Sequence, residues 1–304
     1  MRIPHPIPYQ GSKRKIAKHI LKFFPYRVQR LVEPFAGSAA VTIAAASYGK
    51  ASRFFLNDIN KPLMDLWYAI INHPQEIADE YERLWNEQKG REKAFYYEVR
   101  DAFNKTGEPG LFLYLLARCV KASVRYNAQG EFNQSPDNRR KGRHPKQMRE
   151  DIFAVSNLLK GRTELASKDY KEILQQVNDG DLVYMDPPYQ GGCGDGDPRY
   201  FMGVRFEELL NMLHLLNNRN VPYLLSYDGR TGSKTYGQDI PAELGLHRIE
   251  VNAGRSAQAT LLGRKAITYE SLYLSPALIK KLEADSIPVS DGEQEKQLRF
   301  ALGD

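Results

Sequence analysis

The chain has 304 residues, 42% of them hydrophobic and 26% charged, a composition that excludes a disordered chain and suffices for one sizeable core plus an inserted subdomain. Its net charge of +6 and isoelectric point near 9.1 weakly favour a polyanionic partner such as nucleic acid. Two cysteines, Cys119 and Cys193, exclude a disulfide framework, and the longest apolar run, residues 111–116, is too short to span a bilayer, so we expect a cytoplasmic protein without a membrane segment.

Short β-rich runs alternate with helical patterns, which is typical of an α/β fold whose sheet is covered by helices on both faces. The expected strands, each bounded by Gly, Pro, Asp or Asn, are residues 30–34, 53–57, 164–167, 182–185, 222–226, 247–251 and 271–274. Between the second and third strands the apolar residues recur at helical spacing, as in Ile77-Tyr81-Leu84-Trp85. This interval, residues 61–160, predicts an inserted helical subdomain, and residues 285–304 predict a flexible tail.

The first strand leads into a small-residue turn, residues 33–38, that is typical of a nucleotide-type site. A dinucleotide site would require three glycines and a helix N-terminus open to pyrophosphate, whereas this turn has only Gly37 and places Glu33 beside it. S-adenosylmethionine carries an ammonium and a sulfonium and no phosphate, so it suits an acidic strand end better. Asp58 ends the next strand, where a carboxylate can accept both ribose hydroxyls. Alternatively, Gly37 only ends a strand and Asp58 caps a helix.

A second motif, Asp186-Pro187-Pro188-Tyr189, follows a hydrophobic strand. The amino group of adenine is a poor nucleophile because its lone pair is delocalised into the ring, so catalysis requires acceptors for both N–H bonds. The Asp186 carboxylate and the Pro187 carbonyl can be these acceptors, held rigidly by the two prolines. Tyr189 offers a stacking surface for a base turned out of a duplex. Alternatively, the prolines form a turn and Asp186 caps a helix.

The order of these motifs, over roughly the first 275 residues, resembles the Dam-like family of DNA adenine methyltransferases, the alpha group with a DPPY motif. The resemblance implies a Rossmann-like S-adenosylmethionine-dependent fold with a seven-stranded mixed sheet. It also implies a catalytic domain formed by residues 1–60 and 161–284 and a target-recognition domain formed by residues 61–160. Residues 95–100 and 125–133 are similar to passages of the family's target-recognition domain.

By the same resemblance, Tyr9 and Lys13 contact the methionine end of the cofactor. Asp169 contacts the amino group of the cofactor's adenine, and Tyr170 contacts the edge of that adenine ring. The residues alone suggest a surface loop for the former pair and a helix cap for Asp169. Ala39 replaces a glycine of the family's turn, and we expect it to have a negative φ. The full set of expected cofactor contacts is Tyr9, Lys13, Glu33, Pro34, Phe35, Gly37, Ser38, Asp58, Asp169, Tyr170 and Asp186.

Basic and amide side chains provide the candidate DNA contacts, since Arg and Gln read bases in the major groove but also bind phosphates. For the run 139–143, a solvated charged loop is the alternative to a clamp on the DNA backbone. Lys121-Ala122 stands where enzymes that methylate GATC have Asn-Gly, which argues against a GATC target. The candidates are Arg118, Arg125, Asn127, Arg139, Arg140, Lys141, Arg143, Arg255 and Gln258.

The expected function is therefore direct in-line transfer of a methyl group from S-adenosyl-L-methionine to N-6 of a flipped adenine in double-stranded DNA, without a metal or a cysteine nucleophile. Methylation of RNA or of the cytosine amino group, or a nucleic-acid-binding module that has lost its chemistry, are the alternatives. A cognate restriction endonuclease acting on the same site is a further partner that the resemblance admits. No stable protein partner is implied.

Overall fold

The computed structural model describes residues 2–188, 204–231, 234–236, 238–255 and 267–285. Its sheet has the strand order β3-β2-β1-β4-β5-β8-β7, and β6 pairs with the last residues of β5, outside this order. The strands are β1 Val28–Glu33, β2 Ala51–Asn57, β3 Thr163–Ala166, β4 Asp181–Met185, β5 Tyr223–Thr231, β6 Lys234–Tyr236, β7 His247–Arg255 and β8 Ile267–Leu274. Strands β1 to β5 are parallel and β8 and β7 are antiparallel to their neighbours, so the predicted α/β fold with a mixed sheet is confirmed.

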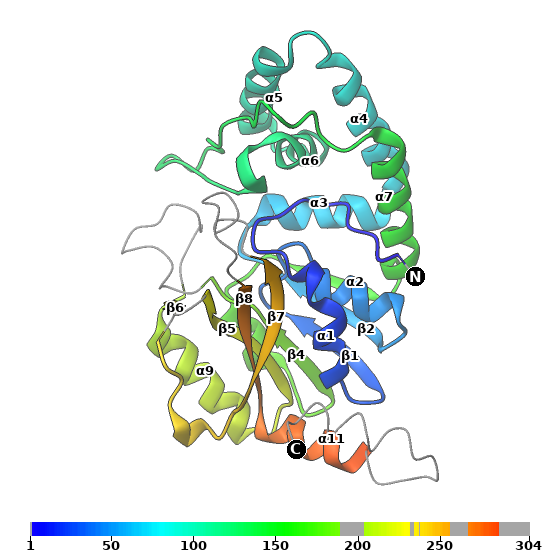
Figure 1. The fold of residues 1–304 in the computed structure, drawn as a ribbon. Helices are drawn as coiled ribbons and strands as arrows, with labels where there is room; N and C mark the ends of the chain where they lie inside the picture. Colours follow the sequence, from blue (N-terminus) through cyan, green and yellow to red (C-terminus); the bar gives the residue numbers. More distant parts are fainter. Residues whose placement is uncertain (1, 189–203, 232–233, 237, 256–266, 286–304) are drawn as a thin grey trace.

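Helices cover both faces of this sheet, and further helices extend beyond it (Figure 1). They are α1 Ala17–Ile20, α2 Ala40–Ser47, α3 Lys61–Asn72, α4 Pro74–Glu87, α5 Glu92–Thr106, α6 Pro109–Arg118, α7 Pro145–Leu159, α8 Tyr170–Gln176, α9 Phe206–Asn218 and α11 Pro276–Asp285. Among the described residues, none of these helices combines the length and the apolar character needed to cross a bilayer.

Alternation along the strands divides the apolar side chains between two cores. Leu31 and Leu182 belong to a large core with helices α1, α2, α3 and α11, while their neighbours Val32 and Val183 belong to a smaller core with α8 and α9. Strand β4 is buried over its whole length. A strand with apolar side chains on both faces needs helices on both faces, which explains the near-continuous hydrophobic run in the sequence.

Helices α3 to α7 lie between β2 and β3 in the chain, and we call residues 61–160 the helical insert. In Figure 1, α4, α5 and α6 gather at the end remote from the sheet, and α3 lies between them and the sheet. Helices α4, α6 and α7 begin with Pro74, Pro109 and Pro145, each in the first turn, where proline costs no hydrogen bond. The insert shares the large core, because Trp67 of α3 and Tyr114 of α6 are part of it.

Candidate active site

A cavity of about 760 Å³ opens at the carboxyl ends of β1, β2 and β4. Its wall is formed by the N-terminal residues 9–13, by the residues that follow these three strands, and by residues 168–171. Strand β4 lies on the opposite side of β1 from β2, so the cavity sits where the strand order reverses, the usual binding position in open α/β sheets. Its volume lies within the range of small-molecule sites.

Asp186 follows β4 directly and lies beside the Lys13 ammonium, with 3.0 Å between Lys13 Nζ and Asp186 Oδ1. Burial raises the pKa of the Asp186 carboxyl, and the positive charge of Lys13 opposes that rise. Pro187 and Pro188 also line the cavity. Tyr189 lies outside the described residues.

Lys13 also lies 3.2 Å from Oε2 of Glu270, so one ammonium bridges two carboxylates. This pairing assigns Lys13 a role beside Asp186, in addition to the cofactor contact that the resemblance implies. Glu270 was not predicted from the sequence: it lies in β8, one residue before the expected strand. An acidic residue among the uncharged residues of this strand was the available signal.

Glu33 ends β1 and is almost completely buried. Its Oε1 accepts a hydrogen bond of 2.5 Å from the backbone N–H of Thr42, in the first turn of α2. Burial raises the pKa of Glu33 to about 8, although the Thr42 hydrogen bonds act in the opposite direction. Glu33 therefore accepts a hydrogen bond from the N-terminus of α2 and also lines the cavity.

The turn between β1 and α2 has a left-handed backbone at two residues, Gly37 with φ 48° and Ala39 with φ 46°. The expectation of a negative φ at Ala39 is wrong. Ala39 N donates to Ala36 O at 2.6 Å, and its fully buried methyl group packs in the core, so the surrounding structure imposes the unfavourable conformation. At Gly37, a Cβ would lie 3.3 Å from the Tyr9 ring, a tight contact. The absence of a side chain at Gly37 therefore lets the Tyr9 ring approach the turn this closely.

Asp58 joins the ends of two strands through its carboxylate. Oδ2 accepts from Gly37 N at 3.0 Å, and Oδ1 accepts from Asn60 N at 3.0 Å. The carboxylate lines the cavity, and burial raises its pKa. Each oxygen retains lone-pair capacity for a further donor. Asp58 thus has a structural role in the turn and also remains available to a ligand.

Asn57, which was not predicted as a site residue, fastens the loops that surround Asp58. Its Nδ2 donates to Pro34 O and to Lys168 O, each at 3.0 Å, and its Oδ1 accepts from Lys168 N at 2.9 Å. The side chain is completely buried. A buried amide with such partners fixes the relative positions of the loops after β1, β2 and β3.

The remaining expected cofactor residues also line this cavity. Asp169 caps α8, since its Oδ1 accepts from Lys171 N at 2.8 Å, as the residues alone suggest. The Tyr170 and Phe35 rings lie 4.9 Å apart at 37°. The Ser38 hydroxyl donates to Ser12 Oγ at 2.7 Å. The structure therefore brings together the described members of the expected set, namely Tyr9, Lys13, Glu33, Pro34, Phe35, Gly37, Ser38, Asp58, Asp169, Tyr170 and Asp186.

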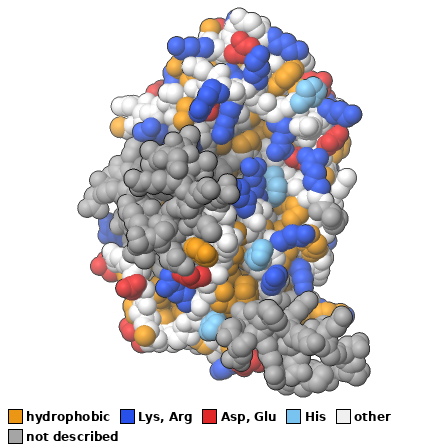
Figure 2. Space-filling view, viewed as in Figure 1, with side chains coloured by type: hydrophobic (Ala, Val, Ile, Leu, Met, Phe, Trp, Pro, Cys, Tyr) orange, Lys and Arg blue, Asp and Glu red, His pale blue; other side chains and the backbone are white. Residues whose placement is uncertain are grey.

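The candidate DNA-contact residues differ in how far their side chains are exposed to solvent. Arg139 and Lys141 have 86% and 76% of their side chains exposed, and Arg140 is also exposed. Figure 2 shows Lys and Arg side chains scattered over the part of the surface that the insert forms. Arg118 is only 2% exposed, so the expectation that it contacts DNA is contradicted: it lies on the inner side of α6, beneath Gly142.

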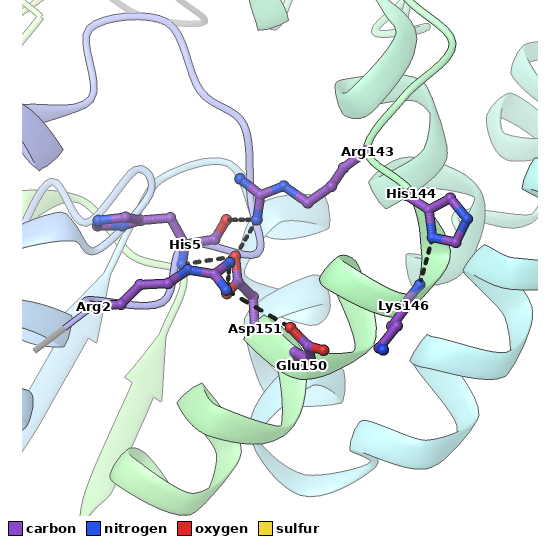
Figure 3. A network of polar contacts seen from close by, with 7 residues as sticks. All are labelled: Arg2, His5, Arg143, His144, Lys146, Glu150 and Asp151. Atoms are coloured by element: carbon purple, nitrogen blue, oxygen red, sulfur yellow. Dashed lines mark hydrogen bonds and ion pairs between the residues drawn. The ribbon is translucent and has the colours of Figure 1, made fainter.

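Arg143 points into the protein, where it donates to the His5 carbonyl at 2.9 Å and to the Asp151 carboxylate (Figure 3). Asn127 stabilises a turn, with its Oδ1 accepting from the backbone N–H of Gln129 and of Glu131. Arg125 is half-buried at the start of this turn. Arg255 ends β7 without a described side chain, and Gln258 lies outside the described residues.

Comparisons with known proteins agree with this site. Residues 9–255 match the family described as D12 class N6 adenine-specific DNA methyltransferase. The chain is 32% identical over 262 residues to the Retron Ec67 DNA adenine methylase of Escherichia coli, covering 84% of this chain and 88% of that protein. It is 24% identical over 271 residues to the type II methyltransferase M1.LlaDCHI of Lactococcus lactis subsp. cremoris, covering 84% and 90%.

A third relative is longer. The DNA N-6-adenine-methyltransferase of Escherichia phage P1 is 28% identical over 220 residues, which cover 69% of this chain but only 27% of the phage protein. The family match extends over the N-terminal motif, the turn after β1, the helical insert and Asp186, which together form or border the cavity. The chain therefore belongs to the D12 class of N6 adenine-specific DNA methyltransferases, and its reaction is the methylation of adenine N6 in DNA.

Proposed function

We propose that S-adenosyl-L-methionine binds in the cavity as the methyl donor and that an adenine turned out of double-stranded DNA enters beside Asp186. The observation that carries this proposal is that Asp58, which follows β2, and Asp186, which follows β4, line the same cavity. The first carboxylate suits the ribose of a nucleoside, and the second suits an amino group that must be activated.

The residues of the cavity fit a cationic nucleoside. Six acidic side chains line it, Glu33, Asp58, Asp169, Asp186, Glu208 and Glu270, together with four basic ones, Lys13, Lys168, Lys171 and Arg205. Lys13 pairs with Asp186 and Glu270, and Lys171 pairs with Asp169 and Glu208, so Glu33 and Asp58 lie outside these ion pairs. The excess of acids favours an ammonium or sulfonium, whereas a pyrophosphate would meet the buried Glu33 where a dinucleotide fold offers an open helix N-terminus. The two Asp58 oxygens can accept both ribose hydroxyls, and the Phe35 and Tyr170 rings offer an apolar surface for a purine.

The proposed chemistry assigns one task to each residue next to the target base. S-adenosyl-L-methionine supplies an electrophilic methyl carbon when it is bound. The Asp186 carboxylate and the Pro187 carbonyl accept hydrogen bonds from the two N–H groups of the adenine amino group, which directs its lone pair towards that carbon. As the nitrogen–carbon bond forms, the sulfur–carbon bond breaks and the nitrogen releases one proton, for which the Asp186 carboxylate is an acceptor. Lys13 favours the ionised form of Asp186, and only this form accepts hydrogen bonds through both oxygens. Transfer is direct and in line.

The DNA-facing part of the proposal rests on the helical insert as the target-recognition domain. Arg139 and Arg140 pair with Asp137, and Lys141 pairs with Glu92, but all three side chains remain more than half exposed. They would contact the DNA backbone by exchanging these carboxylates for phosphates. Because one relative is named a type II methyltransferase, we include a cognate restriction endonuclease that recognises the same site as a partner. The protein would act in the cytoplasm, where the DNA of bacteria and their phages is found.

Two variants test the assignment of the two carboxylates. Asp186→Ala should abolish methyl transfer, by at least about a thousandfold, because an acceptor present at the reacting amino group is lost, while the affinity for S-adenosylhomocysteine changes little. Asp58→Ala should weaken that affinity by about tenfold or more, because hydrogen bonds to the ribose are lost. Transfer of labelled methyl groups and titration calorimetry provide the two measurements.

The substrate is tested in the same assay with duplex DNA, RNA and oligonucleotides whose only amino base is cytosine. Label in duplex DNA alone is expected. Label in RNA alone, full turnover of Asp186→Ala, or unchanged cofactor affinity in Asp58→Ala would each contradict the corresponding part of the proposal. Long-read sequencing of DNA from cells that express the protein would then identify the modified base and its sequence context.

A further inference from the structure

Residues 120–126 connect the helical insert with two walls of the cavity. Gln10 N, in the N-terminal wall, donates to Ala122 O at 3.0 Å. Val124 is itself part of the cavity lining. On the opposite side, the Tyr126 hydroxyl donates to Oδ1 of Asn60 at 3.0 Å. This segment of the insert therefore contacts the cavity at three points.

The contact at Asn60 continues to Asp58, the carboxylate that we propose binds the ribose. Asn60 N donates to Oδ1 of Asp58, and the other Asp58 oxygen accepts from Gly37 N, all at 3.0 Å. Asn60 is almost completely buried and begins α3. Burial raises the pKa of Tyr126, so its hydroxyl keeps its proton and remains a donor. A continuous series of hydrogen bonds thus runs from Tyr126 to Gly37.

Tyr126, where this series of hydrogen bonds begins, belongs to a hairpin that projects from the insert. Tyr126 and Phe132 form a bridge, and Asn127 N donates to Glu131 O at 2.9 Å. The Phe132 ring is buried against the rings of Phe103 and Phe112, while residues 128–131 are exposed. Val124, two residues before Tyr126, lines the cavity that would receive the adenine, so we place the duplex that carries the adenine next to this hairpin.

We propose that Tyr126 is a positioning residue that couples DNA binding at the hairpin to cofactor binding at Asp58, through its hydrogen bond to Asn60. DNA that restrains the hairpin fixes the Tyr126 hydroxyl, and this fixes Asn60 and the Asp58 carboxylate in the orientation that the ribose requires. Coupling between two sites is reciprocal, so the cofactor must strengthen DNA binding by the same factor. This inference rests on the proposed cofactor site.

The test is a titration of the full-length protein with S-adenosylhomocysteine, with and without saturating sheared genomic duplex DNA. The coupling factor is the ratio of the two dissociation constants. We expect at least about fivefold tighter binding with DNA in the parent protein. In Tyr126→Phe, which keeps the ring and removes the hydroxyl, the factor should fall towards one, a loss of roughly two- to tenfold for one hydrogen bond.

Tyr96→Phe is the matched control, because the Tyr96 hydroxyl donates to Gln134 O at 2.9 Å inside the same insert and away from the cavity. It should keep the coupling factor of the parent. Asn60→Leu removes the acceptor, and the double variant with Tyr126→Phe should lose no more coupling than either single variant. If Asn60→Leu folds poorly, the comparison of Tyr126→Phe with Tyr96→Phe alone carries the test.

The outcomes separate the inference from the proposed function. A parent protein that does not bind S-adenosylhomocysteine refutes the cofactor site and the coupling with it. A parent that binds it equally well with and without DNA refutes only the coupling, as does a Tyr126→Phe variant with the coupling factor of the parent. An equal loss in Tyr96→Phe would reduce Tyr126 to a general structural role and overturn the proposal.

Discussion

At the scale of single residues, Lys13 balances the negative charge of Asp186 and Glu270 in the cavity. It lies within ion-pair distance of Asp186 and Glu270, and only about a tenth of its side chain is exposed. Two carboxylates near one another favour protonation of one of them, and burial acts in the same direction on Asp186. The ammonium therefore favours the ionised form of Asp186, in which both oxygens accept hydrogen bonds.

Lys13→Met should shift the acidic limb of the pH profile of kcat to higher pH. Burial raises the pKa of Asp186 and the Lys13 charge lowers it, so removal of that charge leaves a higher pKa, and Asp186 loses its proton only at higher pH. Lys13→Arg keeps the charge and should keep the limb closer to that of the parent. The profiles are measured at saturating cofactor and DNA; an unmoved limb in Lys13→Met would exclude this role.

At the scale of elements, the turn Val120–Ala122 adopts a backbone that its residues do not favour. Lys121 has φ 58° and Ala122 has φ 51°, both left-handed. Asn and Gly adopt this conformation most easily. Lys and Ala adopt it here, and the hydrogen bond from Gln10 N to Ala122 O helps to hold the turn.

Lys121→Gly should raise the free energy of unfolding by about 0.5–1 kcal/mol, because the left-handed strain of about 1–2 kcal/mol exceeds the entropy cost of glycine. Lys121 is exposed, so no buried contact is lost. Lys280→Gly, an exposed lysine within α11, is the control and should lower stability by about 1 kcal/mol. Chemical denaturation measures both; destabilisation by Lys121→Gly would show that the turn is not strained.

The elements were predictable to different degrees for physical reasons. The seven strands β3-β2-β1-β4-β5-β8-β7 were predictable because their sequences, such as that of β4, are rich in apolar residues and are bounded by turn-forming residues. Strand β6 has only three residues and was missed. Arg118 was misjudged because its charge suggests the surface, while residues 110–118 of α6 are all buried, so the helix is enclosed on every face and the arginine with it. Glu270 meets Lys13 only through the pairing of β8 with β5, which no local pattern encodes.

At the scale of the whole molecule, the N-terminal segment is fastened to the helical insert. In Figure 1 it begins beside α7 and passes α3 before it reaches α1. Asp151 of α7 accepts from Arg2 at 2.8 Å, from the His5 backbone N–H at 3.3 Å and from Arg143 (Figure 3). Because residues 9–13 follow this segment into the cavity wall, Asp151 helps to hold the insert and this wall of the cavity in one arrangement.

Asp151→Asn should lower the free energy of unfolding by about 2–3 kcal/mol, because a carboxylate with only 5% of its side chain exposed is lost and the partly buried Arg143 keeps an unpaired charge. Glu150→Gln is the matched control: Glu150 is 51% exposed, lies 3.7 Å from Arg2, and should change stability by less than about 0.5 kcal/mol. Urea unfolding measures both. Since the N-terminal segment carries Tyr9 and Lys13 into the cavity, Asp151→Asn should also weaken S-adenosylhomocysteine binding, and equal affinity in the two variants would show that the network stabilises the fold without positioning the site.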